Sequence, residues 1–351
     1  SLALRIGEAK RDMLADPTGA AAAYEMALEL DPSSTYLQDA CIELWESLGE
    51  GQKLLTVLPR RISAIEADDD GEYAKTLRRD LSRLNAKLQL SENEDPTAAA
   101  AILEGLVEAG GDDAETLEEL ANCYFALQKY EDVERVTLKR IEKLGTADAR
   151  PARLALAALR ADMLGKPRDA FDGYRDLLND GAFDAAVADK LVALAEKNGS
   201  LAEEAVSLSL SPLESGENYA LFFRVAKLAE RAFGSDDAGQ DSHADLALRV
   251  AAVHERAGDA EAAFDATMAA LGRRSALASV RELAKGRAGA AGGDALERLA
   301  DRWLGLATDE MAFEAGPVGT ETRALLRHLE GEIARDSLNA PERALVAFRA
   351  A

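Results

Sequence analysis

The sequence has 351 residues, of which 48% are apolar and only 5% aromatic, and its 41 basic and 64 acidic residues give a net charge of −23. The apolar fraction is enough for a large buried core, and abundant alanine without alternating β-branched runs predicts helices alone. The negative charge argues against nucleic acid and against an acidic membrane surface as the partner, because both attract basic proteins.

Two cysteines, Cys41 and Cys123, are too few for a disulfide framework, and both fall in helical segments. We therefore expect buried, reduced thiols and a cytoplasmic location. A periplasmic or secreted location stays open, because the sequence begins at Ser1 without an initiator methionine. No apolar run approaches the length of a membrane span. The last residue, Ala351, falls inside a repeat, so we expect a piece of a longer protein.

One pattern recurs along the chain: a small residue, a proline ten positions later, an alanine three positions after that, and a bulky residue four further on. The four copies are Gly7–Pro17–Ala20–Tyr24, Ala86–Pro96–Ala99–Leu103, Ala157–Pro167–Ala170–Tyr174 and Gly331–Pro341–Ala344–Phe348. The small residue allows close approach of two helices, and the proline is tolerated in the first turn of the second helix. Asp16 and Asp95 can cap two of these second helices. Each copy therefore predicts a helical hairpin.

Other segments complete the predicted organisation. Residues 35–66, 117–136 and 246–271 read as further helical pairs, whereas 207–217, 234–242 and 286–294 read as irregular. The loop 307–319 is expected to pack against the array through Met311, Phe313 and Val318. We expect an N-terminal array over 1–233 and a C-terminal array over 243–351, continuous or semi-continuous across an acidic, glycine-rich linker at 234–242.

Two stretches resemble the tetratricopeptide repeat. Leu117 through Tyr124 resembles its first half, and Ala20, Tyr24, Ala27 and Pro32 resemble its second half, although the family's tryptophan is absent. Pro17, Pro96 and Pro167 lie 79 and 71 positions apart, about two repeats each. The resemblance implies an all-α fold: a right-handed α-solenoid of about eight to ten tetratricopeptide-like helix–turn–helix repeats. The alanine-rich repeats also resemble those of large bacterial repeat proteins.

The same resemblance implies a non-enzymatic scaffold that binds another protein or an extended peptide, or a component of an assembly. An alternative is an accessory or regulatory array of a larger enzyme or signalling protein, whose catalytic domain lies outside these residues. Self-association through the end units is a third possibility. His243, His254 and His328 belong to no zinc motif, and no phosphate-binding loop or nucleophile elbow occurs. We therefore expect no catalysis, no cofactor and no metal.

In this family the first helices line an inner face, which is where a partner is expected. The residues that the resemblance places there are Gln38, Trp45, Arg83, Lys87, Glu115, Glu118, Asn122 and Phe125. Asn122 matches one position of the family's carboxylate clamp. Glu118 stands where the clamp needs a lysine, which argues against a clamp.

Trp45 and Phe125 occupy the same place when their helices are aligned on Cys41 and Ala121. With the basic residues of the intervening unit, they would form a groove for an extended peptide with apolar anchors and an acid between them. The alternative is that both rings pack between repeats, which is the more common fate of large aromatic side chains.

Overall fold

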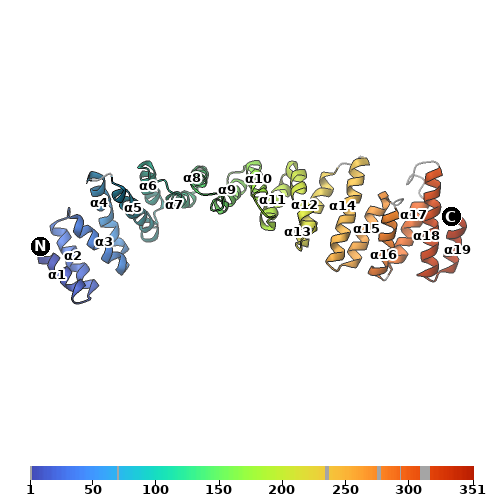
Figure 1. Cartoon of the computed structure of the whole chain (residues 1–351), viewed down its shortest axis with the longest axis horizontal. Helices are drawn as coiled ribbons and strands as arrows, with labels where there is room; N and C mark the ends of the chain where they lie inside the picture. Colours follow the sequence, from blue (N-terminus) through green and yellow to red (C-terminus); the bar gives the residue numbers. More distant parts are fainter. Residues whose placement is uncertain (1, 69–70, 234–236, 275–277, 293, 309–316) are drawn as a thin grey trace. The chain divides into compact units, whose positions relative to one another are not determined.

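The computed structural model describes residues 2–68, 71–233, 237–274, 278–292, 294–308 and 317–351. In these ranges 19 α-helices follow one another, joined by short connections and without any strand (Figure 1). The chain divides into two compact units, Ser1–Gly173 and Tyr174–Ala351. The all-α prediction is confirmed.

In the first unit, helices α1 to α9 follow one another, and each of α1 to α8 packs on the next helix in the chain. They are α1 (Leu2–Asp12), α2 (Pro17–Leu30), α3 (Thr35–Leu48), α4 (Gly51–Asp68), α5 (Glu72–Glu92), α6 (Pro96–Glu108), α7 (Ala114–Ala126), α8 (Tyr130–Lys143) and α9 (Arg150–Asp162). The division between the units falls inside α10 (Pro167–Asn179).

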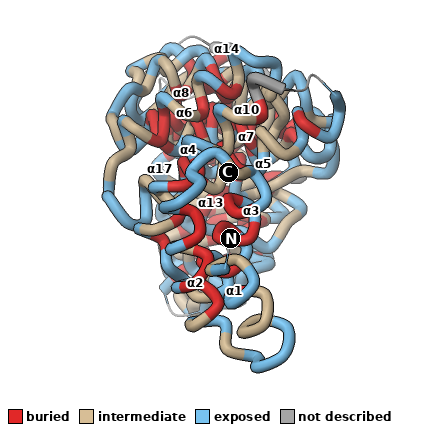
Figure 2. The backbone as a smooth tube through the Cα atoms, turned by 90° about the vertical axis from the view of Figure 1, so that its left-hand side faces the viewer, coloured by how far each residue is buried: buried red, intermediate tan, exposed pale blue. Residues whose placement is uncertain are grey.

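The second unit repeats this arrangement from α11 to α19. Its elements are α11 (Ala185–Lys197), the 3₁₀ turn η1 (Gly199–Leu201), α12 (Ala202–Glu214), α13 (Tyr219–Ala232), α14 (Asp237–Arg256), α15 (Ala260–Arg274), α16 (Ala278–Ala291), α17 (Ala295–Thr308), α18 (Pro317–Asp336) and α19 (Pro341–Ala350). In each unit, buried residues recur along the helices (Figure 2). Stacking of successive helical hairpins confirms the predicted solenoid of tetratricopeptide-like repeats. Among the described residues, no helix is both long and apolar enough to cross a bilayer.

The prolines of the repeated pattern begin helices, as predicted. Pro17, Pro96, Pro167 and Pro341 are the first residues of α2, α6, α10 and α19. Asp16 accepts a hydrogen bond from the Gly19 amide at 2.9 Å. Asp95 accepts from the amides of Thr97 and Ala98, both at 3.0 Å. These carboxylates satisfy amides that have no partner within the helix.

The four hairpins with a leading proline also share a turn that the sequence did not reveal. The residue two positions before each proline has a left-handed backbone: Ala15 (φ 49°), Glu94 (φ 51°), Gly165 (φ 61°) and Asn339 (φ 48°). The next amide bonds a carbonyl six positions earlier, as from Asp16 to Lys10 at 3.0 Å. This bond satisfies a carbonyl at the end of the first helix. Only one of these four residues is glycine, so the residue types at this position did not predict the left-handed turn.

Close packing at the hairpin crossing is also confirmed. A Cβ atom on Gly7 would lie 2.6 Å from the ring of Tyr24, and one on Gly331 would lie 2.6 Å from the ring of Phe348. The alanines that follow the prolines are buried: Ala20, Ala99 and Ala170 are 0% exposed and Ala344 is 3% exposed. No larger side chain fits at these positions without displacing a neighbouring helix.

Three segments predicted to be irregular are largely helical. Residues 207–214 belong to α12, where Ser209 and Leu213 are buried and Pro212 disturbs only the last turn. Residues 237–242 begin α14, and 286–291 end α16. Burial of Ala244 in α14 and of Ala288 in α16 outweighs the weak helix propensity of nearby glycines, a cost of about 1 kcal/mol each. Division of the array at 234–242 stays a prediction.

The loop expected at 307–319 is shorter in the structure, because α17 extends to Thr308 and α18 begins at Pro317. Met311 and Phe313 lie outside the described residues, as does the side chain of Val318. Their predicted packing stays untested.

Substitution of Ala20 or Ala170 by leucine should lower the free energy of unfolding by about 1–3 kcal/mol, because each methyl group is enclosed by the partner helix. Ala22, exposed on the same helix as Ala20, provides the matched control. Ala22→Leu should change stability by less than about 0.5 kcal/mol. Urea unfolding measures all three variants, and equal midpoints for Ala20→Leu and Ala22→Leu would contradict the proposed packing.

The two cysteines are buried and free, as predicted. Burial raises the pKa of Cys41 to about 12 and the pKa of Cys123 to about 11. Since the thiolate is the reactive form, both should be alkylated by iodoacetamide at pH 8 at least roughly 100-fold more slowly than free cysteine. Mass spectrometry over a time course measures this. Fast labelling of the folded protein would show that the thiols are accessible.

Candidate functional site

A groove of about 410 Å³ opens between α7, α8 and α9 in the first unit. Small and apolar side chains form most of its wall: Ala121, Val133, Ala152, Ala155, Leu156, Ala158 and Leu159. Alanines on α9 leave space that larger residues would fill. The groove is therefore a consequence of helices packed side by side with short side chains between them.

Two large apolar side chains line the groove and remain exposed to solvent. Phe125, at the end of α7, is 49% exposed, and Met163, which follows α9, is 48% exposed. Phe125 makes one edge contact with Tyr130, with ring centroids 5.7 Å apart. Neither side chain is buried by its own repeat, so both are available to a ligand.

Polar groups stand around this apolar surface. Glu118 of α7 pairs with Arg140 of α8 at 2.6 Å, and both line the groove. Asn122 and Asp162 also line it and are exposed. An amide such as Asn122 can both donate to and accept from a peptide backbone. The site combines an apolar centre with a polar rim, the usual composition of a protein-binding surface.

Asn122 connects the groove to a smaller cavity. This second cavity, about 100 Å³, lies between α5, α6 and α7 and is lined by Ala86, Lys87, Leu90, Leu103, Glu119 and Asn122. Lys87 is exposed there and forms no ion pair with any residue in the described ranges. The structure thus brings together four of the predicted residues: Lys87, Glu118, Asn122 and Phe125.

Arg83 has a different role from the one predicted. Its guanidinium holds Glu119 at 2.7 and 2.9 Å and donates to Glu115 at 2.8 Å. These bonds, with Glu119 first and Glu115 second, raise the pKa of Arg83, and the same contact lowers the pKa of Glu115. Arg83 therefore joins α5 to α7 and is not free to bind a ligand acid, and Glu115 is its exposed partner.

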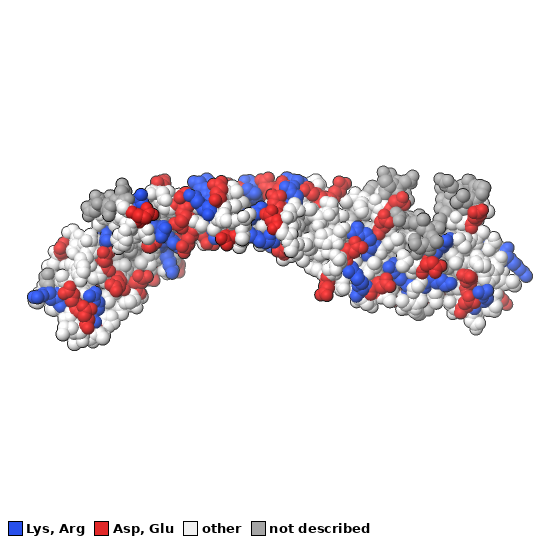
Figure 3. Space-filling model, in the orientation of Figure 1, with Lys and Arg blue, Asp and Glu red and all other residues white. Residues whose placement is uncertain are grey.

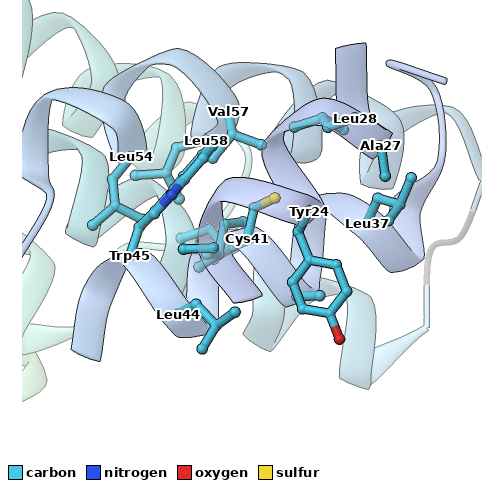
Figure 4. Close-up of a cluster of buried hydrophobic side chains, with 14 of the residues drawn as sticks. Tyr24, Ala27, Leu28, Leu37, Cys41, Leu44, Trp45, Leu54, Val57 and Leu58 are labelled. Atoms are coloured by element: carbon cyan, nitrogen blue, oxygen red, sulfur yellow. The ribbon is translucent and has the colours of Figure 1, made fainter. Parts of the chain in front are cut away.

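Gln38 and Trp45 are not on an exposed face, which corrects the prediction for both. Each is only 2% exposed. The Gln38 amide donates to the Pro32 carbonyl at 2.8 Å. Trp45 lies among Leu54, Leu58 and neighbouring apolar side chains of α4 (Figure 4). Packing between helices is the correct interpretation of Trp45, whereas Phe125 is exposed.

A one-residue error in alignment explains this difference. Applying the 79-residue spacing of Pro17 and Pro96 to Trp45 leads to Tyr124, which is 4% exposed and belongs to the core. Alignment on Cys41 and Ala121 instead paired Trp45 with Phe125. One residue turns a helix by about 100°, enough to move a side chain from the packed face to the surface. The proline spacing already contained the correct register.

Sequence reasoning missed the residues that α8 and α9 contribute. Arg140, Asp162, Met163 and the alanines of α9 were not predicted to line a site. The alanine-rich run over 154–161 was a usable signal, since short side chains on one helix face leave either a close contact or a hollow.

No protein-family model matches the chain, and no curated protein is significantly similar to it in sequence. Several solved structures are similar to it. One is the Cut9–Hcn1 hetero-tetramer of APC/C, at 13% identity and a TM-score of 0.30, with 77% of this chain and 52% of that chain covered. This chain thus spans about half the length of that one.

A second is the TPR domain of P58(IPK), at 14% identity and a TM-score of 0.28, with 99% of this chain and 97% of that chain covered. A third is the human IFIT1 dimer with m7Gppp-AAAA, at 12% identity and a TM-score of 0.28, covering 99% and 76% of the two chains. The helical hairpins seen here, stacked in series within each unit, define this protein as a tetratricopeptide-like α-solenoid.

Replacement of the two aromatic residues by alanine should separate their roles. Trp45→Ala should lower the free energy of unfolding by about 3–5 kcal/mol, because it leaves a large cavity in the core. Phe125→Ala should cost less than about 1 kcal/mol, because the ring is half exposed. Denaturant unfolding of both variants is the measurement, and a larger loss from Phe125→Ala than from Trp45→Ala would contradict the assignment.

Proposed function

We propose that this protein is a non-enzymatic scaffold whose groove between α7, α8 and α9 binds an extended segment of another protein. One observation carries the proposal: a groove of about 410 Å³ has Phe125 and Met163 half exposed along it. Apolar side chains exposed around a concave surface are typical of interaction sites. Burial of these two side chains by a partner would supply binding energy.

The dimensions favour a peptide segment over a globular surface. A concavity near the lower end of the range for ligand pockets accepts a few side chains, not a whole domain. Its wall is mostly aliphatic, so an aliphatic or aromatic anchor is the side chain that fits. Asn122 and the Glu118–Arg140 pair can bond the backbone on either side of that anchor.

We now expect an acidic residue of the partner to be bound beside Lys87 and not beside Arg83. Arg83 is already satisfied by Glu115 and Glu119. Lys87 lies on the far side of Asn122 from the main groove and has no ion-pair partner among the described residues. A segment that follows α7 from Phe125 past Asn122 can therefore place a carboxylate near Lys87, an exposed contact that salt would weaken.

Selection of peptides from a random library on the immobilised protein tests this proposal. Phe125→Ala and Met163→Ala should each weaken binding of the selected peptides by about 1–3 kcal/mol, the usual effect of removing an apolar anchor. Ala155→Trp should abolish binding, because Ala155 lines the groove and an indole at this position would occupy the space that the peptide needs.

Exposed residues outside the groove supply matched controls. Tyr36 on α3 and Met26 on α2 are 52% and 62% exposed, and their replacement by alanine should leave peptide affinity unchanged. Fluorescence anisotropy with labelled peptides measures each variant. Peptides that bind all groove variants as tightly as wild type would rule out this groove as the binding site.

A further inference from the structure

A second hollow, with a different lining, lies near the N-terminal end of α7. It has a volume of about 340 Å³ and is enclosed by the first turns of α5, the connection between α6 and α7, and the last residue of α8. Four of its lining residues are basic: Lys75, Arg78, Arg79 and Lys143. Such a group of cations is unexpected in a chain with a net charge of −23.

Two of these cations are neutralised within the protein. Lys143 pairs with Asp112 at 2.8 Å, and this hydrogen bond lowers the pKa of Asp112. Arg79 lies 3.2 Å from Asp80 and 3.9 Å from Asp113. Asp113 is also occupied as the cap of α7, where it accepts from two backbone amides. Neither aspartate in the lining is left to neutralise the other two cations, and Glu72, the third acidic residue of the lining, is exposed and forms no ion pair with any described residue.

Arg78 and Lys75 are the cations without partners. Across the described ranges, no carboxylate or carbonyl accepts a hydrogen bond from Arg78, and its Nε is buried without any partner. Arginine stays charged in proteins and carries five donors. Buried donors are nearly always satisfied, and each one left unpaired costs stability. An acceptor from outside the chain would remove that cost.

We propose that this hollow is a binding site for a carboxylate group, held by the Arg78 guanidinium with Lys75 beside it. The planar fork of arginine matches the two oxygens of a carboxylate. Four basic and three acidic residues line the hollow, which gives one net positive charge. That charge is balanced by one carboxylate, whereas a phosphate near −2 would leave an excess of negative charge beside Asp112 and Asp113.

The hollow and the groove are neighbours on α8. Arg140 lines the groove and Lys143 lines the hollow, three residues and less than one helical turn apart. If the groove holds a peptide as proposed above, an acidic residue or a C-terminal carboxylate beyond the α7 N-terminus would reach Arg78. The carboxylate site itself does not depend on the groove, since none of its cations lines it.

Titration with sodium acetate at pH 7 and constant ionic strength tests the site. The backbone amide NMR signals of Gly110 and Gly111, which line the hollow, report on it. We expect saturable shifts in the wild type that disappear in Arg78→Gln. Arg78→Lys keeps the charge without the fork and should weaken acetate binding about tenfold. Arg61→Gln is the control. It removes an arginine of α4 that pairs with Asp39 of α3, and this variant should bind acetate as the wild type does.

Further arms distinguish the class and source of the ligand. Inorganic phosphate should shift the same signals only at higher concentration than acetate, and tighter binding of phosphate would overturn the carboxylate assignment. N-acetylated Ala-Ala-Glu-Ala-Ala and its Gln counterpart, each prepared with an amidated and with a free C-terminus, show whether a side chain or a chain end supplies the carboxylate. The Phe125→Ala variant should bind acetate as tightly as the wild type does. The carboxylate site can therefore be tested even if the groove does not bind a peptide. Absence of a saturable shift with acetate, or its persistence in Arg78→Gln, would overturn the proposal.

Discussion

Contact between a small residue and an aromatic ring at the crossing of two helices is the constraint on which this architecture depends. Gly7 lies where a Cβ would come within 2.6 Å of the Tyr24 ring, and Gly331 stands in the same relation to Phe348. Partners in these contacts are 17 residues apart, so each hairpin can form from local chain closure. A left-handed residue and a leading proline then set the turn. Because each helix packs on its chain neighbours, each unit grows by addition of similar elements, without a single central core.

Charge has a structural use in this acidic chain. Acidic and basic side chains are interspersed on the surface in view (Figure 3). Several arginines connect one helix to another, as Arg83 does with Glu119 at 36 residues' separation and Arg287 with Glu255 at 32. Single exposed pairs contribute little to stability, but repeated pairs favour one register between neighbouring repeats. Many cations are paired within the protein, whereas Lys87 and Arg78 have no ion-pair partner in the part of the chain that the structure describes, so both are available to a ligand.

Binding surfaces appear where the repeated packing is incomplete. On α9, alanines face α7 and α8 at positions where other repeats carry larger side chains, and the groove results. Phe125 and Met163 then remain exposed at its edge, since nothing in their own repeats covers them. The same helices provide a rigid frame on which an apolar anchor, a polar rim and a separate cationic hollow lie within one unit.

The sequence by itself determined the helices of the repeated hairpins, the prolines at their starts, the caps at Asp16 and Asp95, and the hairpin crossing at Gly7. These features depend on residues within one or two turns of each other, so a local pattern is sufficient. The burial of Trp45 and the exposure of Phe125 follow from the register of the prolines but not from the alignment on Cys41 and Ala121, and the tertiary structure alone decided that Arg83 is paired with Glu115 and Glu119. Exposure changes with a rotation of about 100° for each residue of register, and an arginine is free or paired according to side chains on another repeat. The helix around Pro212 also depends on tertiary contacts. Burial of Ser209 and Leu213 stabilises α12 by more than the low helix propensity of the proline costs.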